Sequence, residues 1–241
     1  MKSSVSLLLR AAFVFSCVAL LAFAAWQASL RGRADLTAQG PTAQVERWAR
    51  GGRIDSLQRW RRAVDGLRAA QALVPGEAAV YASMARAYSL AAISAPTPSA
   101  ASVYREFSLL HWRLVTMLRP TWPYGWSGIA THTFNLGYAD VMGALSRAMR
   151  YGPWEPGVQL FASRVGLLRW ELLDSTQREE VRQNWRRTAQ RQGEALARMA
   201  VELKREPILC AEGLPGMQKR LQCDKRRNAA PRKRAGNRMT R

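Results

Sequence analysis

The sequence predicts an all-α protein: a short TPR-like helical-repeat solenoid preceded by one N-terminal transmembrane or signal helix. Three observations lead to this class. Residues 11–30 carry no charged side chain. From residue 54 to about residue 203, apolar residues recur at steps of three and four, which is the period of an amphipathic helix. Pro75, Pro120 and Pro153 divide that region into helix-sized pieces, because proline ends one helix and suits the first turn of the next.

These features divide the 241 residues into five segments. We expect a basic N-terminal tail at 1–10, a transmembrane anchor or signal segment at 11–30 and a linker at 31–53. A TPR-like helical domain follows at 54–210, and a basic, mostly disordered tail at 211–241. Apolar residues make up 48% of the chain, which is enough to build a core and excludes a wholly disordered protein.

The apolar segment at 11–30 has the length of a membrane-spanning helix. Twenty helical residues match the ~30 Å hydrocarbon core of a bilayer, and Trp26 near its end suits the membrane interface. The small residues around Ala22–Ala24 would suit a signal peptidase, so a cleaved signal peptide is one interpretation. The apolar run continues to Leu30, which favours an uncleaved anchor. A buried helix of a soluble domain is the third interpretation.

Two signals disagree on orientation. Basic residues after the segment outnumber Lys2 and Arg10 before it, which by charge count places the domain inside the cell. The layout of a short basic start, an apolar run and small residues is that of a signal peptide, and on this ground we expect the domain outside the cytoplasm. The basic residues after the segment are Arg31, Arg33, Arg47 and Arg50.

The body of the chain carries several apolar stripes at helical spacing. Each is of the kind that packs against a neighbouring helix, and no run of alternating β-branched residues competes with them. The stripes are Leu57, Trp60, Val64, Leu67 and Val74; Val103, Phe107, Leu110, Leu114 and Met117; Val158, Phe161, Val165 and Leu168; and Val181, Trp185, Leu196, Met199 and Leu203, with a polar gap before Leu196.

The interval between Pro120 and Pro153 predicts a helix–turn–helix unit. It holds two short helical patterns, at 122–134 and 138–151, and its 33 residues are close to the 34-residue TPR period. Trp126, Ile129 and Ala130 occupy the large, large and small positions of such a repeat. We therefore expect two to three degenerate repeats in a short right-handed solenoid, with an irregular helical bundle as the alternative.

The excess of positive charge gathers at the C-terminus. Lys and Arg total 37 against 17 Asp and Glu, a formal charge of +20, and the last 38 residues hold twelve basic and three acidic side chains. The stretch from Lys225 onward predicts a mobile, solvated tail. Such a tail would attract nucleic acid or anionic lipid head groups, or it would act only as a solvating extension.

No assembled catalytic constellation is visible in the sequence. A phosphate-binding glycine loop, a zinc-binding His-Glu-x-x-His motif and a nucleophile elbow are all missing. His111 and His132 have no accompanying carboxylate or thiol cluster, so we expect helix-packing roles for them and no metal site or cofactor. Asp140 and Glu155 would form a glycoside-cleaving pair only if their carboxyls converged across a groove. We expect a protein that is not an enzyme.

The acidic residues around position 175 predict a helix start. Asp174 or Ser175 would be the N-cap, and carboxylates in the first turn suit the positive end of the helix. These carboxylates are Glu171, Asp174, Glu179 and Glu180.

Four aromatic residues stand at the proline junctions: Trp122, Tyr124, Trp126 and Trp154. In one interpretation each packs across its turn and fixes the angle between successive helix pairs, and this we favour. In the other, exposed rings line a concave groove that binds a peptide or a glycan, as the concave surfaces of repeat proteins do.

Cys210 and Cys223 predict a disulfide. They are 13 residues apart, and Gly213, Pro215 and Gly216 between them let the chain turn back. In an oxidising periplasm such a pair bonds, whereas in the cytosol it stays reduced. Two unrelated thiols are the alternative. Cys17 lies within the apolar segment, and we expect it to act as a small buried apolar residue.

Two segments of the chain resemble the VpsP family. They are LRPTWPYGWSGIA at Leu118–Ala130 and ALSRAMRYGPWEPGVQ at Ala144–Gln159, and the resemblance runs from about Ser56 to Cys210. That family comprises TPR-like, membrane-anchored proteins encoded with bacterial exopolysaccharide biosynthesis and export systems. It provides no catalytic residues to carry over.

The resemblance implies a scaffold or accessory protein that contacts other proteins of a polysaccharide assembly or export system. It would sit in the bacterial inner membrane as a single-pass protein through residues 11–30, with its main domain in the periplasm. Two alternatives stay open: a polysaccharide-modifying enzyme of the cell envelope, and a basic helical protein that binds nucleic acid or anionic lipid.

Overall fold

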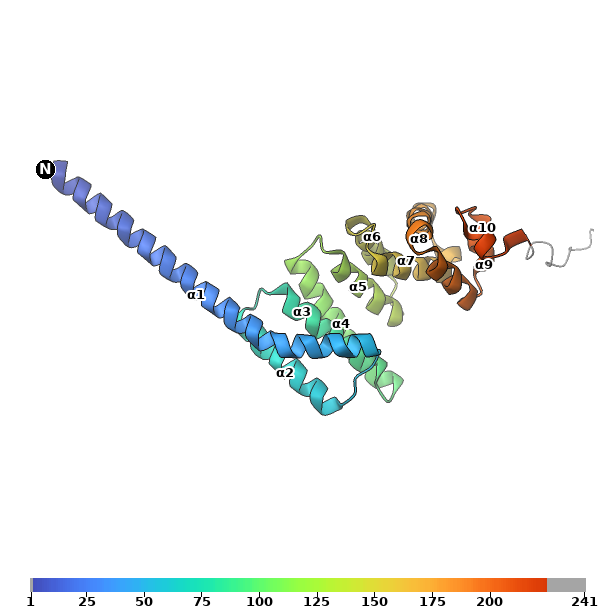
Figure 1. The fold of residues 1–241 in the computed structure, drawn as a ribbon, viewed down its shortest axis with the longest axis horizontal. Coiled ribbons are helices and arrows are strands. Elements are labelled where there is room, and N and C mark those ends of the chain that lie inside the picture. Colours follow the sequence, from blue (N-terminus) through green and yellow to red (C-terminus); the bar gives the residue numbers. More distant parts are fainter. Residues whose placement is uncertain (1, 225–241) are drawn as a thin grey trace, which may run out of the picture. The chain divides into compact units, whose positions relative to one another are not determined.

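The computed structural model describes residues 2–224, with side chains described from residue 12 onward. All regular elements in this range are helices, which confirms the all-α class, and the chain forms two compact units that meet in sequence at Pro120 (Figure 1). The first unit contains α1 (Lys2–Gly51), α2 (Leu57–Leu73), α3 (Ala78–Ile93) and α4 (Pro98–Leu118). The second contains α5 (Pro123–Asn135), α6 (Val141–Tyr151), α7 (Pro156–Arg169), a short 3-10 turn η1 (Trp170–Leu172), α8 (Ser175–Glu202), α9 (Glu206–Ala211) and α10 (Met217–Arg220).

The first half of α1 is apolar, and most of its described side chains are exposed. Its large side chains from Phe13 to Trp26 point to solvent, with Phe15 76% and Leu21 70% exposed. α1 is long and apolar enough to cross a membrane. The helix begins at Lys2, so residues 2–10, expected as a basic tail, are instead its first turns.

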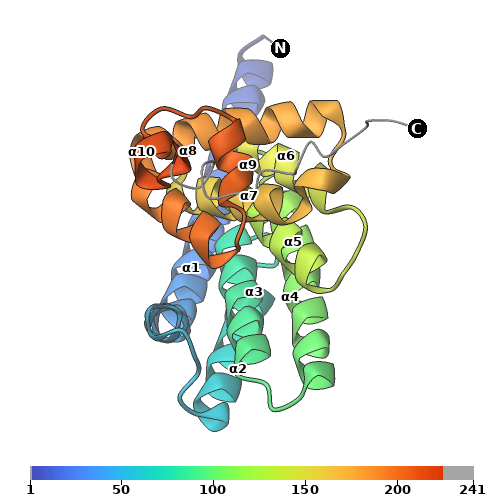
Figure 2. The ribbon, with the colours of Figure 1, turned by 90° about the vertical axis from the view of Figure 1, so that its right-hand side faces the viewer.

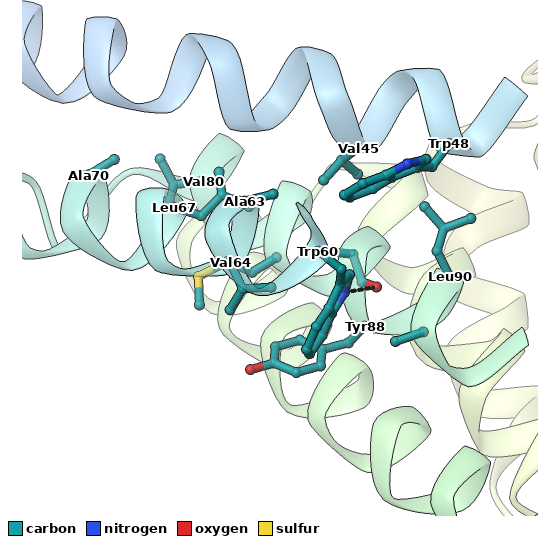
Figure 3. Close-up of a cluster of buried hydrophobic side chains, with 13 residues drawn as sticks. Val45, Trp48, Trp60, Ala63, Val64, Leu67, Ala70, Val80, Tyr88 and Leu90 are labelled. Atoms are coloured by element: carbon teal, nitrogen blue, oxygen red, sulfur yellow. Dashed lines mark hydrogen bonds between the residues drawn. The ribbon is translucent and has the colours of Figure 1, made fainter. Parts of the chain in front are cut away.

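The second half of α1 belongs to the core of the first unit, which corrects the linker expected at 31–53. Ala34, Val45 and Trp48 are buried, and Val45 and Trp48 join the same hydrophobic cluster as residues of α2 and α3 (Figure 3). Together with Ala38 and Pro41 these residues recur at steps of three and four. This is the spacing of one apolar helical stripe, and its members Val45 and Trp48 pack in the cluster formed with α2 and α3.

A proline lies inside this helix. Pro41 removes one backbone donor, and its ring crowds the preceding turn, which bends a helix. In Figure 1 the blue helix α1 changes direction along its length. The half that follows lies against α2, and the Pro41 ring packs over Gly66 of that helix.

The core of the first unit is built around Trp60. Its indole Nε1 donates to the Ala87 carbonyl oxygen over 2.9 Å, and its ring meets Tyr88 edge-on with centroids 5.6 Å apart (Figure 3). Val64 and Leu67 are buried one and two turns later, as their stripe predicts. In Figure 2 the helices α2, α3 and α4 stand side by side around this core.

α4 buries a different face from the one its apolar stripe predicts. Val103, Phe107 and Leu110 are about half exposed, and Met117 is 77% exposed. The buried face instead carries Leu109, Trp112 and Val115, together with the polar residues Ser108 and His111. Small alanines of α3 allow this close approach, since the Ser108 hydroxyl donates to the Ala85 carbonyl oxygen over 2.7 Å.

The second unit opens with the predicted helix–turn–helix. α5 and α6 lie within a few residues of the expected 122–134 and 138–151, and they pack against each other. Gly137 turns the chain between them with a φ of +76°, a conformation that favours glycine. α6 buries Val141, Leu145 and Ala148 against α5 and α7.

α7 and α8 are joined by a buried polar network. The Asn184 amide nitrogen donates to the Gln159 carbonyl oxygen and to Ser163 Oγ, each over 3.0 Å, and Thr188 lies beside Ser163. α8 begins with a capping box in which Asp174 accepts from the Gln177 amide over 2.9 Å, as the acidic run predicts.

The C-terminal part of the described chain extends the core of the second unit. Leu214, Met217 and Leu221 are buried in the cluster that holds Trp185 and Leu196, which corrects the tail expected over this part of 211–241. Cys210 and Cys223 are joined by a disulfide, with Cα atoms 5.7 Å apart. The mobile tail expected from Lys225 lies outside the described residues.

Candidate functional site

The two histidines are packing residues. His111 stacks on Tyr88 with centroids 5.3 Å apart, and its Nδ1 lies 2.6 Å from the Phe107 carbonyl oxygen. Burial lowers the pKa of His111; the hydrogen bond to Phe107 opposes that shift, and the charge of Arg68 adds to it. His132 is buried on α5. Over residues 12–224, no group of three or more potential metal ligands is assembled.

Asp140 and Glu155 lie at opposite ends of α6. Asp140 caps the start of that helix and accepts from the Gly143 amide over 3.1 Å, while Glu155 follows its end and accepts from the Tyr124 hydroxyl. Eleven helical residues rise about 16 Å. The two carboxylates therefore do not converge at the spacing of about 5 to 9.5 Å that glycoside cleavage uses.

The two proline junctions, far apart in sequence, are packed against each other. A Cβ built on Gly152 would lie 2.5 Å from Pro123 Cβ, so only glycine lets the end of α6 approach the start of α5 this closely. Tyr124 reaches across the same contact to Glu155. Trp122 meets Tyr124 edge-on, with centroids 5.9 Å apart.

The four aromatic candidates divide into packed and exposed residues. Trp122 and Trp126 are half-buried, and Trp126 lies under the Arg147 guanidinium at 4.6 Å. Tyr124 is 36% exposed and Trp154 51%. Trp122, Trp126 and Tyr124 fit the packing interpretation, whereas the Trp154 indole lies on the surface.

Trp154 lies beside two arginines of α8. The guanidinium carbons of Arg187 and Arg191 are 5.8 and 6.0 Å from the centroid of its ring. Arg191 also donates to the Trp154 carbonyl oxygen over 3.2 Å. An indole with cations beside it attracts them through its quadrupole, so ring and guanidiniums form one surface.

A backbone irregularity in α8 holds this surface in place. Gln192 leaves helical geometry, with φ −136° and ψ 34°, and its side chain donates to the carbonyl oxygen of Pro156 and to Gln159 Oε1. Gln159 in turn donates to the Pro153 carbonyl oxygen over 2.9 Å. The turn that carries Trp154 is therefore held by hydrogen bonds to the residues before and after it, Pro153 and Pro156.

A surface pocket of about 280 Å³ lies next to this turn. It is formed by α6, by the turn after it and by the first half of α8. Its lining residues are Ser146, Met149, Arg150, Pro153, Glu180, Gln183 and Arg187. We call these residues, together with Trp154, the Trp154 pocket.

Sequence reasoning singled out Trp154 but missed its partners. The sequence does not single out Arg150, Arg187 and Arg191, because their grouping depends on the contact between α6 and α8. The spacing of Arg187 and Arg191, one helical turn apart, is the available signal. It shows that both face one side of the helix, and nothing local indicates that this side meets a tryptophan.

In the first unit, a groove of about 580 Å³ separates the second half of α1 from the start of α3. Asp35, Glu46 and Glu77 give it an acidic rim, and Leu36 beside it is 73% exposed. Glu77 is paired with Arg119 over 3.2 Å.

Comparison of the chain with protein-family models, with curated proteins and with solved structures gives no match. The candidate sites therefore rest on their own geometry.

Proposed function

We propose that this protein is a membrane-anchored, TPR-like scaffold, without catalytic activity, in the biosynthesis or export of a bacterial exopolysaccharide. The observation that carries the proposal is the course of α1. One helix supplies both the apolar segment and, through Val45 and Trp48, part of the core of the first unit. An anchor joined by a flexible linker would let the domain diffuse, whereas this one holds the first unit at the membrane surface.

The exposed face of α4 supports action through protein–protein contacts. Val103, Phe107, Leu110 and Met117 are spaced to form one apolar stripe on the surface of the first unit. Soluble proteins rarely expose contiguous apolar patches of this kind unless the patch binds something. Another protein of the same assembly is the partner we propose.

The cellular setting is supported by the resemblance to the VpsP family and by the disulfide. Residues Leu118–Ala130 and Ala144–Gln159, which carry the resemblance, fall at the two packed junctions of the α5–α6 hairpin. The bond between Cys210 and Cys223 suits an oxidising compartment, which favours a periplasmic domain and an inner-membrane anchor.

The two alternatives receive different support. Separation of Asp140 and Glu155 by the length of α6 argues against a glycosidase of the usual two-carboxylate kind. The eight basic and no acidic residues from Lys225 to Arg241 favour contact with anionic lipid or nucleic acid as a second candidate function.

Deletion of the gene tests the proposal. Loss of the scaffold should reduce the yield or chain length of secreted polysaccharide, and a plasmid copy should restore both. A matched plasmid copy that lacks residues 225–241 should restore them equally. Unchanged polymer in the deletion strain would refute the scaffold function, and rescue that depends on residues 225–241 would favour the second candidate.

A further inference from the structure

The ring of Trp154 lies on the surface, which is unusual for a tryptophan whose role is packing. Of the nine tryptophans, Trp154 is the one outside the apolar segment of α1 whose ring is mainly solvent-exposed. Its backbone is held by Arg191, and the neighbouring Pro153 and Pro156 carbonyls are held by Gln159 and Gln192. A rigidly supported, exposed ring is a preorganised platform on which a flat or ring-shaped ligand loses little entropy on stacking.

The positive charges in the pocket are available to a ligand. Within the described chain, neither Arg150 nor Arg187 makes an ion pair, whereas Arg182 and Arg186 on the same helix as Arg187 are both paired with Glu179. Arg187 lines the pocket and also flanks the Trp154 ring. A guanidinium in this position can bind a carboxylate through two parallel hydrogen bonds.

The pocket also contains a carboxylate. Glu180 lies in its wall and accepts from the Ser146 hydroxyl. Sugar hydroxyls can donate to this carboxylate, whereas a chain of phosphodiesters has no donor to offer it. The Gln183 side chain, also in the wall, can both donate and accept.

We propose that the Trp154 pocket binds one residue of an acidic polysaccharide. The sugar ring stacks on the Trp154 indole, its carboxylate is bound by Arg187 and Arg150, and its hydroxyls hydrogen-bond with Glu180 and Gln183. The volume of about 280 Å³ is just below the range of about 300–1,000 Å³ that is usual for drug-sized ligands, which suits a single sugar residue. This binding activity goes beyond the proposed protein–protein scaffold and can be measured whether or not that function holds.

The experiment is calorimetric titration of the full chain, in nanodiscs of neutral phosphatidylcholine, at physiological salt. The probes are a tetramer of hexuronic acid, the neutral hexose tetramer with the same linkage, an acidic hexapeptide and a dT oligonucleotide. The uronic acid tetramer should bind saturably and at least about tenfold more tightly than the neutral one, since loss of a charge-assisted contact is worth about one decade.

Five matched variants locate the binding. Trp154→Ala and Arg187→Gln should each weaken binding of the acidic tetramer about tenfold, and Trp154→Phe, which keeps a ring, should retain it within about threefold. Tyr138→Ala removes another exposed aromatic side chain, at the opposite end of α6, and Arg198→Gln removes an exposed charge further along α8. Both should bind as the wild type does. Unchanged melting temperatures establish that the variants are folded.

Several results would overturn the inference. Absence of saturable binding of the acidic tetramer would do so. Equal losses of affinity for the tetramer in Arg198→Gln and Arg187→Gln would also do so, because they would show attraction by the overall charge of the protein. Tighter binding of the oligonucleotide or the acidic peptide, lost in Trp154→Ala, would assign the pocket to that class of ligand instead.

Discussion

Gly66 of α2 lies directly against Pro41 of α1. A Cβ built on Gly66 would be 2.6 Å from Pro41 Cγ, closer than side-chain carbons approach one another. Glycine in a helix interior costs about 1 kcal/mol relative to alanine, so this position is unfavourable for α2 alone. The close contact accounts for it, and it holds α1 against α2 at the bend in α1.

Gly66→Ala should therefore destabilise the first unit, although alanine is the better helix former. Overpacking costs about 1–3 kcal/mol, which exceeds the gain of about 1 kcal/mol in helix propensity. Thermal melting monitored by circular dichroism measures the difference. Gly76→Ala, where an added Cβ meets nothing within 4 Å, is the control and should leave the melting temperature nearly unchanged. A stabilised Gly66→Ala protein would contradict the packing.

Asn184→Ala should destabilise the second unit by about 1–3 kcal/mol. Asn184 is 1% exposed, and its amide donates to the Gln159 carbonyl oxygen and to Ser163 Oγ. Its removal leaves buried acceptors without a donor. Urea denaturation gives the free energy of unfolding. Gln190→Ala, exposed on the same helix, should stay within about 0.5 kcal/mol of the wild type, and an equal loss in both variants would refute the role of the network.

The disulfide should stabilise the end of the second unit by about 3 kcal/mol, the value expected for closing a loop of this size. Reductant should lower the unfolding midpoint of the wild type and leave that of a Cys210→Ser/Cys223→Ser variant unchanged. In cells lysed with an alkylating agent, both cysteines should be protected from labelling until reductant is added. Labelling of both in the folded, unreduced protein would argue against the bond and against a periplasmic domain.

Stability should fall as the pH drops below about 6.5, the ordinary pKa of histidine, because of His111. Burial lowers the pKa of His111 in the folded state, so the unfolded chain takes up a proton at a higher pH than the native protein does. The unfolded state is therefore favoured as the pH falls from the unfolded pKa towards the folded one. Above that window His111 is neutral in both states, and its contribution to stability does not change with pH.

His111→Gln removes this titration and should flatten the dependence. Urea denaturation at pH 7.5 and 5.5 measures it: the wild type should lose more stability between the two values than the variant does. The other buried histidine, His132, remains in both proteins and cancels in the comparison. Equal losses in the wild type and the variant would show that His111 is not protected from protonation by the fold.

Local pattern was sufficient to predict much of the helical structure. Trp60, Val64 and Leu67 are buried as their spacing predicts, and the α5–α6 hairpin follows from Pro120, Gly137 and Pro153. The predicted capping of α8 by Asp174 is also found. These features depend on contacts within one helix or one turn, which the order of residues specifies directly.

Features that depend on a neighbouring helix were missed. Residues 31–53 are a linker by the sequence prediction, yet residues 31–51 continue α1, because Gly66 of α2 provides the space that Pro41 needs. On α4 the apolar stripe that the sequence predicts lies on the exposed face, since α3 offers an alanine surface and a carbonyl oxygen that suit Ser108. Neither outcome can be derived from one segment alone.

The Trp154 pocket shows the same limit. Trp154 is conspicuous in the sequence because it follows a proline, but Arg187 lies 33 residues later and reaches it only through the packing of α8 on α6 and α7. The kink at Gln192, which aligns Arg191 with the Trp154 turn, follows from side-chain bonds to the Pro156 carbonyl oxygen and to Gln159. Such bonds exist only in the folded unit.

The scaffold that we propose must be held at the membrane by α1. The most direct measurement is secreted polysaccharide in a deletion strain complemented with three versions of the chain. They are the wild type, a version in which an unrelated apolar 19-residue segment replaces residues 12–30, and a version in which a cleavable signal peptide releases residues 31–241 into the periplasm. Wild type and the replaced anchor should restore polymer, and the released domain should not. Full restoration by the released domain would contradict the account.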